Sequence, residues 1–158
     1  MAEVFLPKVP AKLIQNFLND YYHLPREKET ILERMTDYDP VLRAQFTYSN
    51  YDERGTSFYI DGVAMTYGLL TQAAGRLDTR LPKIDSNIAD RFLVMLAKDW
   101  YGLKGAILDD LIEINEDLLT LVHRYKCDKT KRCFLEGMLA VYGLLEMQAG
   151  ADSGIGPN

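Results

Sequence analysis

The sequence predicts an all-α protein that forms a single domain of six to seven helices. Apolar residues recur at helical spacing along most of the chain, with Gly, Pro, Asp and Asn clustered between these stretches in place of short alternating strands. The length of 158 residues and a composition that is 47% hydrophobic and 26% charged are those of one folded globular domain. A third observation is an internal repeat at an offset of 75 positions.

The first half of the chain, about residues 10–76, predicts four helices behind an extended arm. Asp39 stands as an N-cap before Pro40 at the first helical position, which places a helix start there. Thr56 or Ser57 is expected to cap the last of these helices, and Gly75 is expected to end it. The arm covers residues 1–9, and the helices are predicted at about 11–22, 26–35, 40–48 and 58–74.

The second half, about residues 85–150, predicts three helices after a linker. Asp85, or one of the two residues after it, is expected to cap the first helix, and Gly102 and Gly105 are expected to mark the turn that follows. The linker is predicted at 77–85 and the helices at about 85–100, 106–125 and 128–149, and the tail at 151–158 is expected to be mobile.

The last helix of each half is similar to the other when the chain is compared with itself at the offset of 75. We therefore infer two helical units of about 75 residues that arose by duplication. A unit of that size has a marginal core by itself, so the two are expected to share one core. The residues that recur without a gap are Gly62, Tyr67, Gly68, Leu69, Leu70, Ala74 and Gly75, which match Gly137, Tyr142, Gly143, Leu144, Leu145, Ala149 and Gly150.

Both of these helices are apolar nearly all the way round, which predicts that they are buried at the centre of the fold. Each carries a stripe of small residues at helical spacing, with Gly68 in the first helix and Gly143 in the second. A glycine inside a helix costs roughly 1 kcal/mol relative to alanine, so two matching glycines predict close packing. We expect the two central helices to lie against each other at Gly68 and Gly143.

Charge and hydropathy exclude several classes of protein. The chain has 18 Lys and Arg against 23 Asp and Glu, a net charge of −5, which opposes non-specific binding to nucleic acid or anionic lipid. The longest apolar run, Phe92–Ala97, is far shorter than the roughly 18 residues that span a bilayer. The N-terminus lacks the basic start of a secretory signal, and two cysteines are too few for a disulfide framework. These features favour a cytoplasmic protein.

Acidic residues are the main candidates for chemistry. Asp61 and Glu136 occupy matching positions of the two central helices, where a carboxylate pair would serve as acid and base or bind a divalent cation. The alternative is that each acid is exposed and stabilised near a helix N-terminus. Glu113 and Glu116 form an ExxE pair that resembles half of the acidic motif of the all-α nucleoside triphosphate pyrophosphohydrolases. That resemblance implies Mg²⁺-dependent chemistry, but the downstream ExxD partner is not found.

Other features favour structural roles. The acids Glu113 and Glu116 fall outside the apolar arc of their helix, together with three neighbouring acids, which indicates a solvated face. Asn115 lies on the apolar face and is expected to be hydrogen-bonded in the core. The histidines and cysteines have no zinc-ligand spacing, and no glycine-rich phosphate loop is present. The basic run from Arg124 to Arg132 leaves open a nucleic-acid-associated regulator as a further alternative.

An aromatic surface is the predicted interaction site. Tyrosines favour binding surfaces because the ring offers a large contact area and the hydroxyl tolerates water. We therefore predict a small non-enzymatic interaction or regulatory protein with a protein partner, no cofactor and no metal, and a homodimer remains open. The alternative is a Mg²⁺-dependent enzyme or small-ligand binder that uses the paired carboxylates. The residues predicted to bind the partner are Tyr38, Tyr48, Tyr51, Tyr59 and Phe5.

Overall fold

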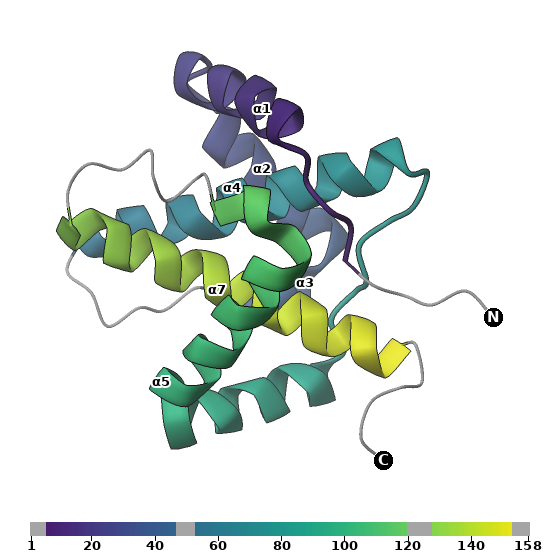
Figure 1. Cartoon of the computed structure of the whole chain (residues 1–158), viewed down its shortest axis with the longest axis vertical. Coiled ribbons are helices and arrows are strands. Elements are labelled where there is room, and N and C mark those ends of the chain that lie inside the picture. The colour runs from purple at the N-terminus through teal and green to yellow at the C-terminus, as the bar shows by residue number, and fades with distance from the viewer. Residues whose placement is uncertain (1–5, 47–52, 120–127, 153–158) are drawn as a thin grey trace.

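The computed structural model describes residues 6–46, 53–119 and 128–152, and within these residues the protein contains helices and no strand (Figure 1). The prediction of an all-α fold is confirmed. The elements are α1 (Ala11–His23), α2 (Glu27–Tyr38), α3 (Pro40–Ala44), α4 (Glu53–Arg76), α5 (Ser86–Asn115), the short 3₁₀ helix η1 (Glu116–Leu119) and α7 (Asp128–Asp152). Among the described residues, no helix is both long and apolar enough to cross a membrane.

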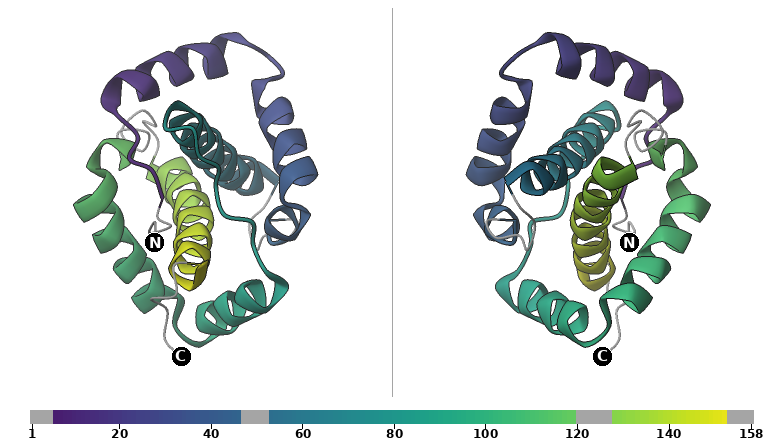
Figure 2. Two further views of the ribbon diagram at one scale, coloured as in Figure 1. Left: turned by 90° about the vertical axis from the view of Figure 1, so that its right-hand side faces the viewer. Right: turned by 90° about the vertical axis from the view of Figure 1, so that its left-hand side faces the viewer.

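Helices α4 and α7 form the centre of the fold. Figure 2 shows the other helices arranged as a ring around this pair. Residues 62–70 of α4 and 136–145 of α7 are all buried, which matches the apolar character that these helices show on every side. The prediction that these two helices are central is confirmed.

The two central helices meet at a different pair of glycines from the one expected. A Cβ atom on Gly62 would overlap the carbonyl oxygen of Phe134 and lie 3.0 Å from the backbone nitrogen of Met138. A Cβ atom on Gly137 would overlap the carbonyl oxygen of Tyr59 in the same way. Backbone therefore touches backbone at this crossing, which only glycine permits.

Gly68 and Gly143 face the surrounding helices instead of each other. Gly68 lies six positions after Gly62, about 240° further round the helix, so it points away from the crossing. The side chains that fill the space at Gly68 are Phe17 and Ile31, and those at Gly143 are Phe92 and Ile107. The expectation that the central helices pack together at Gly68 and Gly143 is wrong.

Several helix boundaries also differ from the predictions. Helix α4 begins at Glu53, so Thr56 and Ser57 lie inside its first turns and do not cap it, and Gly75 is followed by one more helical residue. Helix α7 continues to Asp152, past the predicted end at Ala149. Residues 47–52 and 120–127, where part of two predicted helices falls, lie outside the described residues.

Helix α5 is bent at Asp99, where the backbone is non-helical (φ −157°, ψ 78°), whereas the sequence placed a turn at Gly102 and Gly105. The carboxylate of Asp99 accepts a hydrogen bond from the Gly102 backbone N–H at 3.0 Å, so this residue caps the start of the second arm. We call residues 86–98 the first arm of α5 and residues 100–115 the second arm. The second arm ends at Asn115, well before the predicted helix end at residue 125.

Two extended segments are held by buried polar side chains from the opposite half. Asn115 accepts a hydrogen bond from Val9 N–H at 2.8 Å and donates one to the Pro7 carbonyl, which confirms the prediction that it is hydrogen-bonded in the core. Asp39 caps α3 as predicted and also accepts a hydrogen bond from Ile84 N–H at 2.8 Å. Ile84 follows Val9 by the repeat offset of 75 positions. Each half thus fixes the segment that leads into the other.

Candidate binding groove between α5 and α7

The predicted aromatic surface is only partly described, and its described members have partners within the chain. Tyr38 donates a hydrogen bond to the Leu81 carbonyl at 2.7 Å, and Lys83 lies over its ring. Tyr59 packs on Phe46, and burial raises the pKa of Tyr59 to about 12. Both rings are half-buried parts of the fold. The other predicted members, Phe5, Tyr48 and Tyr51, lie outside the described residues.

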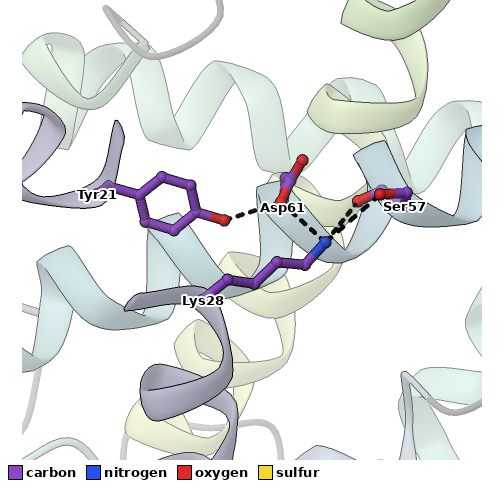
Figure 3. Close-up of polar contacts among 4 residues, drawn as sticks. All are labelled: Tyr21, Lys28, Ser57 and Asp61. Carbon is purple, nitrogen blue, oxygen red and sulfur yellow. Dashed lines mark hydrogen bonds and ion pairs between the residues drawn. The ribbon is translucent and has the colours of Figure 1, made fainter. Parts of the chain in front are cut away.

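Asp61 is part of a polar cluster that joins α1 and α2 to α4 (Figure 3). Its carboxylate accepts a hydrogen bond from the Tyr21 hydroxyl at 2.8 Å and forms an ion pair with Lys28 at 3.0 Å. Lys28 also reaches the hydroxyl and the carbonyl oxygen of Ser57. The cluster joins the outer helices α1 and α2 to the central helix α4, so Asp61 stabilises the packing of these helices.

Glu136 is held in the corresponding place on α7 by two cations. Lys104 from the second arm of α5 and Arg132 from α7 each approach its carboxylate to 3.5 Å. Burial raises the pKa of Glu136 above its usual range. Asp61 and Glu136 therefore each pair with a lysine from their own half of the chain.

Glu113 and Glu116 lie at the rim of an open cleft of about 810 Å³. Both side chains are exposed, in agreement with the predicted solvated face. Lys8 and Arg76 line the same cleft from the N-terminal segment and from the end of α4. Among the described residues, no three His, Cys, Asp or Glu side chains converge as a metal site would require.

A second cavity lies between the two arms of α5 and the C-terminal half of α7. Its volume is about 520 Å³, within the range of sites that take small molecules or short peptide segments. In Figure 1 the arms meet at the bend, and α7 crosses near the opening between them. We call this cavity the α5–α7 groove. Its apolar lining comes mainly from Ile88, Phe92, Met95, Leu103, Ile107 and Met147.

Two acids face each other in this groove. Glu146 of α7 and Asp110 of α5 both line it and share a hydrogen bond. Burial raises the pKa of Glu146 to about 7, and the charge and hydrogen bond of Asp110 contribute in the same direction. Glu146 therefore holds its proton up to about pH 7. Arg91 also lines the groove, but no ion pair in the described part of the chain joins it to either acid.

The groove lies beside the contact that surrounds Gly143. Phe92 and Ile107 fill the space at Gly143, as Phe17 and Ile31 fill the space at Gly68. Ala106 and Asp110 also line the groove, and both are exposed.

Sequence reasoning missed this pair. Asp110 is exposed and falls outside the apolar arc of its own helix, so the pattern there predicts only a solvated acid. Glu146 lies on a helix that the apolar pattern predicts to be buried, and an acid there is the signal that would have found the pair.

Comparison of the chain with protein-family models, with curated proteins and with solved structures finds no match.

Proposed function

We propose that this chain is a non-enzymatic binding protein whose α5–α7 groove receives a short amphipathic helix from a protein partner. The observation that carries the proposal is the groove itself, a cavity of about 520 Å³ with an apolar floor, open on one side and bounded by helices. Recognition of an amphipathic helix in an apolar groove is a recurring mode of protein association.

The dimensions of the groove support a helical ligand. Along α7 it extends from Gly143 to Ala151, which corresponds to about 12 Å at a rise of 1.5 Å per residue. Two turns of a bound helix have about the same length, so apolar side chains at positions i, i+3 or i+4 and i+7 would all reach the floor. Buried Phe92 and half-exposed Met95 offer the aromatic and flexible surface that such contacts favour.

We also propose that the protein arose by duplication of a unit of about 75 residues. Shifted by 75 positions, the bounds of α1 become 86–98 and those of α4 become 128–151, close to the first arm of α5 and to α7. The reciprocal glycine crossing and the reciprocal hydrogen bonds of Asn115 and Asp39 support the same proposal.

The groove is tested with a fluorescent 14-residue peptide that carries leucine at positions i, i+3, i+4 and i+7 and glutamine elsewhere. Saturable binding is expected by fluorescence anisotropy. Ala106→Trp fills the groove and is expected to weaken binding at least tenfold. Ala97→Trp places the same side chain on α5 outside the groove and is expected to change affinity less than twofold. Equal binding by the two variants would show that the peptide does not use the groove.

A further inference from the structure

We propose that the α5–α7 groove selects a helix that carries a lysine or arginine, whose cation binds between the carboxyl groups of Asp110 and Glu146. This inference rests on the proposed function and names the chemistry of the partner. It depends on charge complementarity between an acidic pair in an apolar groove and a basic residue beside the apolar face of the ligand.

The first step of the reasoning is the position of the two acids. Asp110 comes from the second arm of α5 and Glu146 from α7, so the pair bridges the two walls of the groove. Ile107 and Met147 are neighbours of these acids in sequence and line the same cavity. A helix seated on this apolar floor would therefore bring its flanking polar residues directly over the pair.

The second step concerns the charges around the pair. Arg91 on the first arm of α5 is the one cation among the described residues that line the groove, and no ion pair joins it to either acid. On α7, Tyr142 stays neutral because burial raises its pKa to about 12, with smaller contributions from Glu146 and Asp110. At neutral pH no cation among the described residues of the groove is thus paired with Glu146, and the proton on Glu146 compensates for its burial beside Asp110.

A ligand cation would replace that proton. In the free protein, the charged form of Glu146 is penalised by its own burial and by the nearby charge of Asp110, and protonation of Glu146 relieves both. An ammonium or guanidinium group within hydrogen-bond distance of both acids also relieves both, and it adds charge-assisted hydrogen bonds. Binding of a basic helix is therefore coupled to release of the Glu146 proton, and its affinity rises with pH through the range near 7 in which Glu146 titrates.

The test uses three labelled peptides with the same leucine face that differ at one central flanking position, which is lysine, glutamine or glutamate. Affinities are measured by fluorescence anisotropy at pH 5.5 and at pH 8. We expect the lysine peptide to bind at least tenfold more tightly at pH 8 than at pH 5.5. The glutamine peptide is expected to change less than twofold, and the glutamate peptide is expected to bind most weakly at pH 8.

Variants separate this inference from the proposed function. The double variant Asp110→Asn and Glu146→Gln is expected to keep its affinity for the glutamine peptide and to lose both the lysine preference and its pH dependence. Asp109→Asn removes a neighbouring exposed carboxylate outside the groove and is expected to keep both. Isothermal titration of the lysine peptide at pH 7 in buffers of different ionisation enthalpy is expected to show proton release.

Each contrary result has a definite meaning. Equal affinities of the lysine and glutamine peptides at pH 8, or a lysine preference that survives in the double variant, would overturn the inference and leave the groove proposal standing. Absence of binding by all three peptides would overturn the proposed function, and this inference with it. Displacement of the lysine peptide by hexylamine at equal concentration would identify a small amine as the occupant and refute a helical partner.

Discussion

Substitution of Gly62 by alanine tests the close contact between the two central helices. The added Cβ atom would overlap the carbonyl oxygen of Phe134, and the next obstacle, the backbone nitrogen of Met138, is 3.0 Å away. Neither atom can rotate aside as a side chain would, so α4 and α7 must separate. Overpacking in a core costs about 1–3 kcal/mol and occasionally more. Because the obstacle is backbone, we expect the upper part of that range.

The helical preference of alanine opposes this cost. Alanine stabilises a helix by up to about 1 kcal/mol relative to glycine, so the net loss in the free energy of unfolding for Gly62→Ala is expected to be about 2 kcal/mol. Gly75→Ala is the matched control on the same helix. A Cβ atom at Gly75 meets nothing within 4 Å, so this variant is expected to be unchanged or stabilised by up to about 1 kcal/mol.

Urea denaturation followed by circular dichroism and by the fluorescence of the single tryptophan, Trp100, measures both effects. For a chain of this length a loss of about 2 kcal/mol lowers the melting temperature by roughly 4–8 °C. The double variant Gly62→Ala and Gly137→Ala is expected to lose less than the sum of the single losses, because one separation of the helices accommodates both Cβ atoms. A Gly62→Ala variant as stable as Gly75→Ala would refute a backbone contact at this crossing.

Three further predictions concern the polar groups. Burial raises the pKa of Glu146 from 4.5 to about 7, so between these pH values the folded state holds a proton that the unfolded state has lost. The free energy of unfolding therefore falls as pH rises through this window. Glu146→Gln is expected to remove this pH dependence, which amounts to at most about 3 kcal/mol, as measured by urea denaturation. Asn115→Ala leaves Val9 N–H without its acceptor and opens a small void, so it is expected to cost about 2–4 kcal/mol in the same assay. Lys28→Gln breaks a partly exposed ion pair with Asp61 and is expected to cost less than about 1 kcal/mol by thermal melting, whereas a larger loss would show that the pair is strongly desolvated.

Local chemistry determines the parts of the fold that the sequence predicts well. Asp39 before Pro40 and Asp85 before α5 cap helices as expected, because an N-cap needs only its own carboxylate and an amide two or three residues later. The buried position of α4 and α7 follows from apolar residues on every face of each helix. These features need no knowledge of a distant segment.

The misplaced features have two different causes. Helix α5 bends at Asp99, whose carboxylate accepts a local hydrogen bond from the Gly102 N–H, but the apolar periodicity on either side gives no sign of a break there. The crossing lies at Gly62 instead of Gly68, because Phe17 and Ile31 occupy the space at Gly68. The sequence of α4 alone does not distinguish the two glycines, because the positions of the outer helices determine which of them lies at the crossing.

The acid pair, like the crossing of α4 and α7, depends on residues that are far apart in the sequence. Asp110 and Glu146 lie 36 positions apart on different helices, and each is unremarkable beside its own neighbours. Their interaction depends on the bend in α5, which turns the second arm so that Asp110 meets α7. Tyr38 and Tyr59 have contacts inside the fold, and their predicted role at a partner surface stays a prediction.

The crossed hydrogen bonds of Asn115 and Asp39 have a consequence for biosynthesis. The acceptor of the Val9 N–H lies 106 residues further along the chain, so this bond cannot form until Asn115 has left the ribosome. The second bond, which the Ile84 N–H donates to the Asp39 carboxylate, likewise forms only after the residues on both sides of the linker have been synthesised. The segment around Val9 therefore remains accessible to chaperones and proteases until the second arm of α5 has been synthesised.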